Sequence, residues 1–213
     1  MKFNNSYVDL DEIEEFTIAH YEDNAESFRV GTKDHDVNQN IDAFLSALLP
    51  KEKKLDILDF GCGPGRDMCV FKSMGHSPVG LDGSKEFCKM AEQQSDCPTL
   101  NQQFLNLKLE EKSFDGIFSN ASLFHVPSKE LPRVLNELHC ALRKEGILFS
   151  SNPRGNAEGW QGQRYGHYME FEASETYLQQ SGFKIIEHFY RPAGMPREYQ
   201  PWLAIVSQRQ DPK

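Results

Sequence analysis

The sequence lacks long uncharged apolar runs and has little positive charge. Its longest apolar stretches, such as Ile147 to Phe149 and Leu203 to Val206, are far shorter than a membrane-spanning helix. Residues 1–16 contain acidic side chains where a secretory signal needs an apolar segment, so we expect a cytoplasmic location. Lys and Arg number 23 against 32 Asp and Glu, a net charge of −9. This balance argues against a nucleic-acid partner, because phosphate backbones are bound by clustered cations.

Cysteine is also scarce. The five cysteines form no CxxC pair and have no Cys/His zinc spacing. We therefore expect no metal site and reduced thiols that pack as small apolar groups. Otherwise the chain has the composition of an ordinary globular protein, with 38% hydrophobic and 11% aromatic residues. Its 213 residues fit a single domain, which we expect to span residues 1–213.

The first fifty residues predict a helical cap. Apolar residues at helical spacing predict one helix over 9–26, with Gly31 as a break, and a second from Asp36 to Leu49 that ends at Pro50. Residues 51–213 form the predicted core, in which short apolar strands alternate with helices. Since parallel neighbours need a long connection across one face, this alternation predicts a parallel, doubly wound α/β sheet. The predicted strands are 55–60, 77–81, 99–103, 114–119 and 147–151, separated by helices over 67–74, 85–94 and 129–142.

The last third departs from this alternation. Residues 152–168 are rich in Gly, Asn and Arg and are predicted to form a long loop. A helix over 171–181 then precedes two strands, 183–190 and 202–207, joined by a Pro/Gly loop without a helix. Two strands joined in this way predict a hairpin, so the sheet is expected to contain an antiparallel strand.

The most informative segment is LDILDFGCGPGRD, residues 55–67. A strand leads into glycines 61, 63 and 65, after which a helix begins. Glycines at this point let the backbone turn sharply and approach a ligand beside the free N–H groups of the helix. Asp82 closes the second strand, 21 residues after Gly61, where a carboxylate can accept hydrogen bonds from both ribose hydroxyls. The combination predicts a nucleoside-binding site.

The glycine spacing differs from the dinucleotide fingerprint GxGxxG, because Arg66 stands three residues after Gly63. Instead DFGCGPG and the following LDGS resemble the first two motifs of class I methyltransferases that use S-adenosylmethionine (SAM). FDGIFSNASLFHVP (114–127) is similar to the family's fourth-strand motif, and LRKEGILFSS (142–151) to its entry into the fifth strand. The resemblance implies a Rossmann-like seven-stranded sheet of order 3-2-1-4-5-7-6, with strand 7 antiparallel, helices on both faces and an N-terminal helical cap.

The same resemblance implies which residues hold SAM. It places Asp59, Gly61, Gly63 and Gly65 along the methionine and ribose, Asp82 on the ribose, Gly83 and Ser84 beside the adenine, and Asn120 and Ala121 under the methyl donor. Gln103 and Phe104 occupy the position where the family usually has an acidic residue for the adenine amine. HYEDNAESF (20–28) resembles the Tyr-rich helix that small-molecule methyltransferases fold over SAM, which implies Tyr21 as a cofactor contact; the alternative is a helix that packs on the sheet. In the polar segment that follows, we expect Thr32 or Lys33 to reach the methionine carboxylate.

Methyl transfer from a sulfonium requires in-line alignment above all, and a general base only where the acceptor is protonated. His125, which follows the fourth strand, is one candidate base, and His167 is another. Each has a structural alternative: His125 as a buried histidine that orients its loop, and His167 as part of an exposed aromatic loop. We therefore predict an enzyme whose cofactor is SAM and whose partner is a small-molecule substrate, and leave its oligomeric state open.

Arginines gather in the segments that follow the strands, where open α/β sheets bind ligands. An arginine fork binds carboxylate or phosphate in a bidentate manner, so these residues favour an anionic or zwitterionic small substrate. An amino-acid-like thiol or imidazole compound, as in ovothiol formation, is one such acceptor. The alternative for the arginines is pairing with nearby glutamates in solvent. The candidate substrate residues are Arg154, Arg164, Tyr165, Tyr168, Arg191 and Arg197.

Three other functions remain alternatives. A NAD(P)-binding protein shares the glycine turn and Asp82, but the spacing and the terminal hairpin argue against it. A protein or nucleic-acid methyltransferase is disfavoured by the net acidity and by SNAS in place of an N/D-PPY run after the fourth strand. A noncatalytic SAM-binding protein would share every motif named above.

Overall fold

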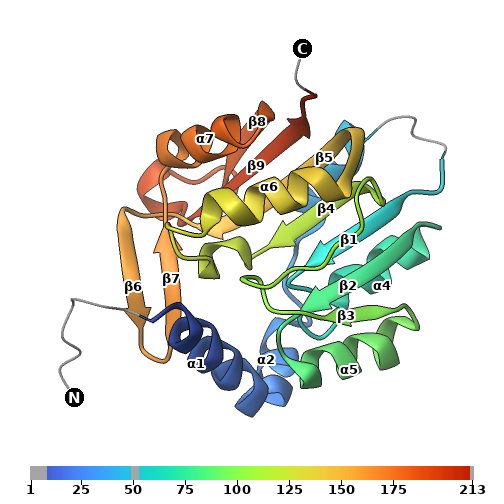
Figure 1. Cartoon of the computed structure of the whole chain (residues 1–213), viewed down its shortest axis with the longest axis vertical. Helices are drawn as coiled ribbons and strands as arrows, with labels where there is room; N and C mark the ends of the chain where they lie inside the picture. Colours follow the sequence, from blue (N-terminus) through green and yellow to red (C-terminus); the bar gives the residue numbers. More distant parts are fainter. Residues whose placement is uncertain (1–8, 49–52, 212–213) are drawn as a thin grey trace.

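A seven-stranded sheet forms the centre of the molecule (Figure 1). The computed structural model describes residues 9–48 and 53–211. The strand order is β3-β2-β1-β4-β5-β9-β8, in which only β9 runs antiparallel to its neighbours. In sheet numbering this is 3-2-1-4-5-7-6, so the predicted Rossmann-like topology is confirmed. The strands are β1 (Asp56–Phe60), β2 (Ser77–Asp82), β3 (Thr99–Asn101), β4 (Phe114–Asn120), β5 (Leu142–Pro153), β8 (Phe183–Arg191) and β9 (Trp202–Arg209).

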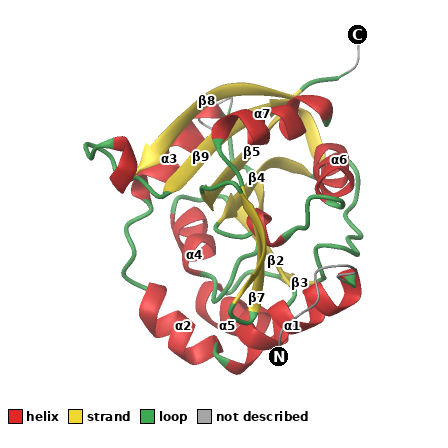
Figure 2. Cartoon of the chain, turned by 90° about the vertical axis from the view of Figure 1, so that its left-hand side faces the viewer, coloured by secondary structure: helices red, strands yellow, loops and turns green. Residues whose placement is uncertain are grey.

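Helices cover both faces of this sheet (Figure 2). One face packs against α6 (Leu131–Ala141) and α7 (Phe171–Gln180), through leucines such as Leu135, Leu138 and Leu178. The other face packs against α3 (Asn38–Ala47), α4 (Arg66–Ser73) and α5 (Lys85–Ser95). Strands buried on both sides read as continuous apolar runs, which is why they were visible in the sequence.

The cap consists of α1 (Leu10–Asp23) and α2 (Ala25–Thr32), followed by α3. The prediction that Gly31 breaks a helix is wrong, because Gly31 lies inside α2. A glycine costs a helix only about 1 kcal/mol relative to alanine, which neighbouring turns can offset. The break falls instead at Asn24, whose side-chain amide donates to the carbonyl of His20 at the end of α1. The predicted end of the next helix, at Leu49 and Pro50, lies outside the described residues.

Residues 152–168 do not form the predicted long loop. β5 continues to Pro153, and a separate hairpin follows, β6 (Ala157–Gln161) and β7 (Arg164–Tyr168). Gly162, with φ +65°, begins its two-residue turn, a backbone conformation typical of tight hairpins. Trp160 and Tyr165 pair across the strands with ring centroids 5.7 Å apart. The hairpin stands beside α1, away from the main sheet (Figure 1).

Across the described ranges we find no helix with the length and apolar character of a membrane span.

Candidate active site

A cavity of about 920 Å³ lies between the cap and the carboxyl ends of the central strands. Its volume is near the upper end of the roughly 300–1,000 Å³ usual for ligand pockets. Many of the predicted site residues line it, from the cap, the strand ends and the hairpin. They are Tyr21, Thr32, Gly61, Gly63, Asp82, Gly83, Ser84, Phe104, Asn120, Ala121, His125, Arg164, Tyr168 and Arg191.

The glycine turn after β1 has left-handed backbone at all three glycines, with φ values of +77°, +52° and +90°. A Cβ at Gly61 would lie 2.2 Å from Cβ of Ser122, and one at Gly65 only 2.6 Å from Cα of Ala91. These two glycines therefore permit close packing of the turn against β4 and α5. A Cβ at Gly63 would meet only the Phe28 ring, at 3.8 Å, so this glycine keeps room open within the cavity.

Asp82 ends β2 beside this turn. Its carboxylate accepts hydrogen bonds from the backbone N–H of Gly63 at 3.0 Å and of Ser84 at 2.9 Å. Burial raises the pKa of Asp82 to about 6, although these two backbone donors act in the opposite direction. A hydrogen-bond donor arriving from a ligand would stabilise the ionised form further.

Two more carboxylates lie close to the turn. Asp59 is 2% exposed, and its Oδ2 has no hydrogen-bond partner among the described residues. Burial, and then the nearby charge of Asp67, raise the pKa of Asp59 well above its usual range. Asp67 is paired with Arg66 at 2.7 Å and accepts from the Asn120 side chain at 3.1 Å. Asp67, Asp82 and the Arg66 guanidinium line this end of the cavity, with Asp59 buried beside them, a setting that favours a cationic ligand.

Aromatic side chains from the cap close the cavity above the glycine turn. The rings of Tyr21 and Phe28 lie 5.5 Å apart, and each lies within 6 Å of the Phe87 ring on α5 (5.8 and 5.3 Å). Thr32, at the end of α2, donates its hydroxyl to the carbonyl of Phe28. Its own carbonyl accepts from Arg66 at 3.0 Å, which ties the cap to the glycine turn.

The region expected to hold an adenine is only partly as predicted. Gly83 packs against Ile18, Ser84 caps α5 through its side chain, and Phe104 stacks on Phe60 with centroids 4.3 Å apart. Gln103 is exposed and does not line the cavity. An acidic group is nevertheless present, because Glu14 of α1 lines this region and accepts from the backbone N–H of Leu105 at 2.8 Å. Sequence reasoning missed Glu14, since it comes from the cap, 91 positions away from Leu105.

His125 lies in the short helix η1 (Leu123–His125) after β4, enclosed by the cap and the hairpin. Its Nε2 is 2.9 Å from the Tyr21 hydroxyl, and its Nδ1 is 2.6 Å from the carbonyl oxygen of Tyr165. Burial lowers the pKa of His125 to about 4, and the nearby Arg164 acts in the same direction. The imidazole is therefore neutral at pH 7.

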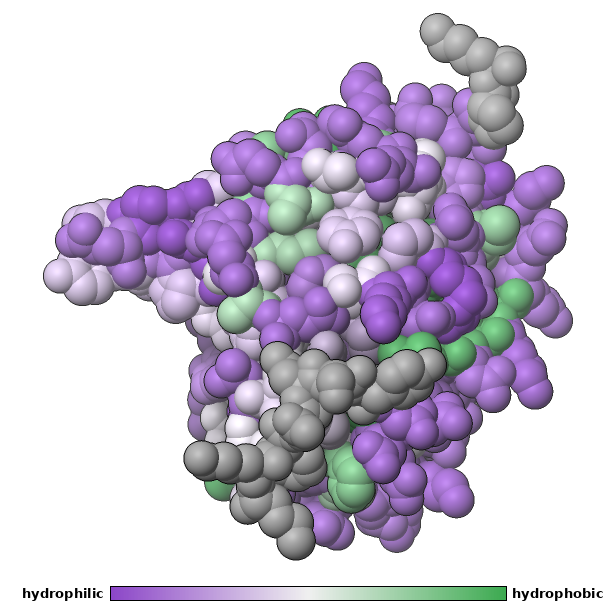
Figure 3. Space-filling view, turned by 60° about the vertical axis from the view of Figure 1, so that its left-hand side comes forward, coloured by the Kyte–Doolittle hydropathy of each residue, from purple (hydrophilic) through white to green (hydrophobic). Residues whose placement is uncertain are grey.

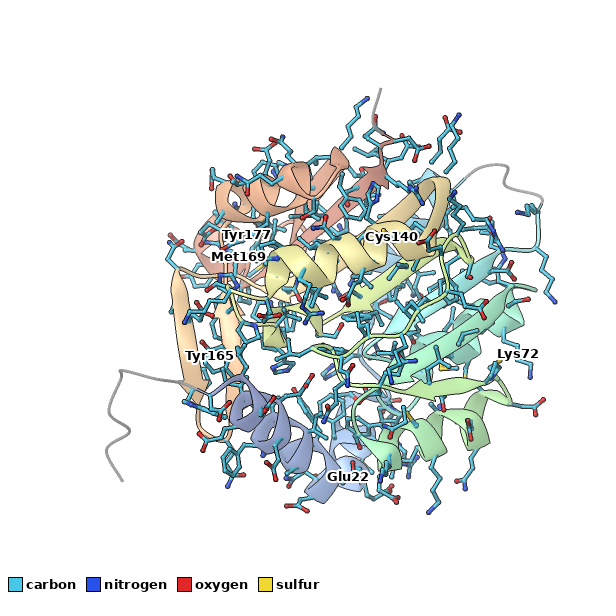
Figure 4. The ribbon with its side chains drawn as sticks, in the orientation of Figure 1. Glu22, Lys72, Cys140, Tyr165, Met169 and Tyr177 are labelled. Atoms are coloured by element: carbon cyan, nitrogen blue, oxygen red, sulfur yellow. The ribbon has the colours of Figure 1, made fainter. Side chains whose placement is uncertain are left out.

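The second histidine candidate lies elsewhere. His167 lines a separate cavity of only about 20 Å³, together with Met169 and Tyr177, which lie near each other by α6 and α7 (Figure 4). Burial lowers the pKa of His167, and its Nδ1 has no partner within the described part of the chain. The structure thus separates His167 from the large cavity, which argues against His167 as a base for a ligand bound there.

The predicted substrate residues divide into two groups. Arg164, Tyr168 and Arg191 line the cavity. The other group does not: Arg154 pairs with Glu170 at 3.2 Å, and Arg197 lies over the Tyr190 ring. Tyr165, visible on the hairpin in Figure 4, donates its hydroxyl to Glu158 at 3.0 Å.

The end of the cavity that contains Arg191 is built from three neighbouring strands. Pro153 of β5 is opposite Trp202 of β9, which is opposite Arg191 of β8. Facing residues on adjacent strands lie close together, so these side chains form one row along the cavity. Phe124 and Tyr168, with ring centroids 5.7 Å apart, also line the cavity. Sequence reasoning missed Trp202, which strand register brings here, and Phe124, which comes from η1. Figure 3 shows mostly hydrophilic residues on the hairpin side of the molecule, in contrast to this lining.

Comparisons with known proteins show which domain and which fold the chain is similar to. Residues 58–150 match the family model described as a methyltransferase domain. A malonyl-[acyl-carrier protein] O-methyltransferase of Pectobacterium atrosepticum is 32% identical over 105 residues, covering 49% of this chain and 41% of that protein. A cycloartenol-C-24-methyltransferase of Arabidopsis thaliana is 27% identical over 146 residues, covering 62% and 42%. The chain thus spans less than half the length of these curated relatives.

Among solved structures, the 1,6-didemethyltoxoflavin-N1-methyltransferase of Burkholderia thailandensis, crystallised with S-adenosylhomocysteine (SAH), has a TM-score of 0.79. It is 20% identical, with 98% of this chain and 93% of that chain covered. Over residues 58–150 the chain thus matches a methyltransferase domain, and over nearly its whole length it shares the fold of this SAM-dependent enzyme.

The site also fits SAM in charge. SAM has a sulfonium and an ammonium, and the carboxyl groups of Asp67 and Asp82 line the cavity at the glycine turn, with that of Asp59 buried beside them. Within the described part of the chain, the buried Oδ2 of Asp59 has no hydrogen-bond partner, in keeping with a ligand donor at this end.

Proposed function

We propose that this protein transfers the methyl group of SAM to a small molecule bound at the end of the cavity lined by Arg191, Trp202 and Tyr168. The observation that supports it best is one large cavity that combines two kinds of lining. The carboxylates at the glycine turn suit the cationic cofactor. Arg191, Trp202 and Tyr168 line the same cavity and offer a guanidinium and aromatic rings to an acceptor. Such a cavity has room for a donor and an acceptor together.

The fold alone does not establish this chemistry. The [4+2]-cyclase SpnF has the same fold, with a TM-score of 0.71 at 13% identity and 92% of this chain covered. The function therefore has to be argued from the site. When bound, SAM supplies a methyl group already activated by the sulfonium. What the chain contributes is alignment and exclusion of water, through the carboxylates at the turn and the aromatic rings of Tyr21 and Phe28.

We further propose an anionic or zwitterionic acceptor. Arg191 lines the cavity, and among the described residues its guanidinium makes one hydrogen bond, from Nη2 to the carbonyl of Asp36 at 2.8 Å. The remaining guanidinium donors are available for a carboxylate. Asp34 and Asp36 line the same cavity and supply anionic groups for an ammonium. This pairing also supports the amino-acid-like acceptor of the ovothiol type.

The methyl transfer can be tested by incubating the protein with methyl-labelled SAM and a deproteinised metabolite extract, and identifying the labelled product. We expect a labelled compound of low molecular mass. Arg191→Ala should raise KM for that compound by about 10-fold or more, and Arg191→Lys should restore it only partly, because lysine lacks the bidentate fork. Arg197→Ala, outside the cavity, is the matched control.

Binding experiments discriminate the remaining alternatives. Calorimetric titration should show binding of SAM and SAH but not of NADH or NADPH. Binding of SAH without any labelled product across several extracts would favour a noncatalytic SAM-binding protein. Binding of a nicotinamide cofactor in preference to SAH would contradict the proposal.

A further inference from the structure

We infer that His125 is a positioning residue that holds Tyr21 over the cofactor site, and that it does not accept the proton of the acceptor molecule. This inference rests on the proposed function for the ligand it names. It is carried by a chain of hydrogen bonds that joins the cap, the end of β4 and the hairpin.

The direction of each hydrogen bond in this chain follows from the groups involved. The carbonyl oxygen of Tyr165 can only accept, so Nδ1 of His125 bears the hydrogen. Arg164 can only donate, and its Nη1 lies 3.2 Å from the Tyr21 oxygen, which accepts there. The Tyr21 hydrogen is then directed to Nε2 of the neutral imidazole, at 2.9 Å. Both ring nitrogens of His125 are thus hydrogen-bonded, and the lone pair on Nε2 accepts the hydrogen bond from Tyr21.

The surroundings of His125 oppose its protonation. Arg164 of β7 lies close by, and His20 of α1 adds repulsion when it is charged. Tyr21 and the carbonyl of Tyr165 complete the polar neighbours. A proton taken from the acceptor would create an imidazolium beside Arg164, in a cavity that also receives a sulfonium. Taking up that proton is therefore unfavourable, whereas accepting a hydrogen bond from Tyr21 leaves the imidazole neutral.

The elements that these hydrogen bonds join show what the Tyr21–His125 bond stabilises. Tyr21 is on α1, and α1 also contacts the hairpin through Thr17, whose Oγ1 accepts from the Tyr165 N–H at 3.1 Å. Phe16 packs edge-on against Trp160 at 6.1 Å. The Tyr21–His125 bond adds a direct link between α1 and the segment that follows β4. It fixes the aromatic wall above the glycine turn, and so sets how tightly the cofactor is enclosed.

Conservative variants separate positioning from proton transfer. In His125→Gln the side-chain oxygen can accept from Tyr21, but an amide cannot take up a proton at neutral pH. We expect His125→Ala and Tyr21→Phe each to weaken SAH binding by about 5- to 30-fold in calorimetry. The double variant should be no weaker than the stronger single defect, because both remove one bond. His125→Gln should retain most of the SAH affinity and most of the labelled-methyl transfer. His139→Gln, far from the cavity, is the control for the substitution itself.

Hydrogen exchange of the free protein supplies a second measurement that needs no ligand. His125→Ala should accelerate exchange in residues 10–23, and His125→Gln should leave it near the wild-type rate. The inference is overturned if His125→Ala leaves both SAH affinity and exchange unchanged. It is also overturned if His125→Gln binds SAH normally but abolishes methyl transfer, as loss of a base would. A wild-type protein without affinity for SAH would contradict the proposed function instead, while the exchange result would still decide the role of His125.

Discussion

At the scale of single residues, burial shifts two titratable groups of the site in opposite directions. The pKa of Asp82 is raised to about 6, so the folded chain binds a proton there more readily than the unfolded chain. Asp82 therefore contributes stability at low pH that is lost as the pH rises through 6. The pKa of His125 is lowered to about 4, so the unfolded chain takes up its proton first. His125 therefore costs stability as the pH falls from about 6.5 towards 4.

These opposing effects predict different pH profiles for two variants. When the pH falls from 7.5 to 5, the unfolding free energy of Asp82→Asn, measured in urea, should decrease by about 1 kcal/mol more than that of wild type, because the stabilising protonation of Asp82 is absent. Over the same interval the unfolding free energy of His125→Gln should decrease by about 2 kcal/mol less than that of wild type. Parallel profiles for all three proteins would show that neither group titrates as its environment indicates.

At the residue scale, the carboxylate of Asp82 also couples cofactor binding to pH. A ligand that donates to Asp82 prefers its ionised form, so SAH affinity should rise by up to about 10-fold per pH unit below pH 6 and level off above it. The measurement is calorimetry between pH 5 and pH 8. Asp82→Asn should bind SAH weakly at every pH and lose most of this dependence, whereas an equally steep dependence in that variant would assign it to another group.

At the scale of elements, two glycines of the turn between β1 and α4 have different roles, Gly61 in packing and Gly63 in ligand binding. Gly61→Ala forces a Cβ into Ser122 at a positive φ, so we expect a loss of at least about 2 kcal/mol of unfolding free energy. Gly63→Ala incurs mainly the backbone strain of about 1–2 kcal/mol, but its methyl enters the cavity and should weaken SAH binding by 10-fold or more.

Gly75→Ala is the matched control for this pair. Its φ is +89° and nothing lies within 4 Å of the added Cβ, so it reports strain alone. Thermal melts and SAH titration of the three variants test the assignment. If Gly63→Ala bound SAH as well as Gly75→Ala does, the turn would not face the cofactor.

At the scale of the whole molecule, a ligand in the cavity connects the cap to the sheet. The cap is already held by Arg66 on the Thr32 carbonyl, by Arg191 on the Asp36 carbonyl, and by Asn40 on Asn120 at 3.1 Å. SAH at 100 times its Kd should raise the unfolding free energy by about 2.7 kcal/mol. Hydrogen exchange should slow most in α1 and α2 and least in α6 and α7, which pack on the sheet away from the cavity. Equal protection everywhere would contradict this placement.

The sequence by itself determined the features that depend on local chemistry and periodicity. Buried strands, the glycine turn and Asp82 lie within one β-α-β unit, where spacing of glycines and apolar residues dictates both the elements and their order. Gly83, Ser84 and Phe104 were expected beside the adenine only from the family resemblance, and all three line the cavity. The terminal antiparallel strand was also predictable, since a Pro/Gly loop with no more than a three-residue 3-10 turn (Arg197–Tyr199) joins β8 to β9.

Only the tertiary structure decided which distant residues meet. Arg154 and Arg197 match Arg191 in type and in their nearness to strand ends, yet of these three only Arg191 lines the cavity. Strand register sets Arg191 opposite Trp202, whereas Arg154 pairs with Glu170 and Arg197 lies over the Tyr190 ring. Glu14 stands where Gln103 was expected, and His125 meets Tyr21 across 104 positions. Sequence spacing cannot express these contacts, because they arise when the cap and the hairpin pack over the sheet.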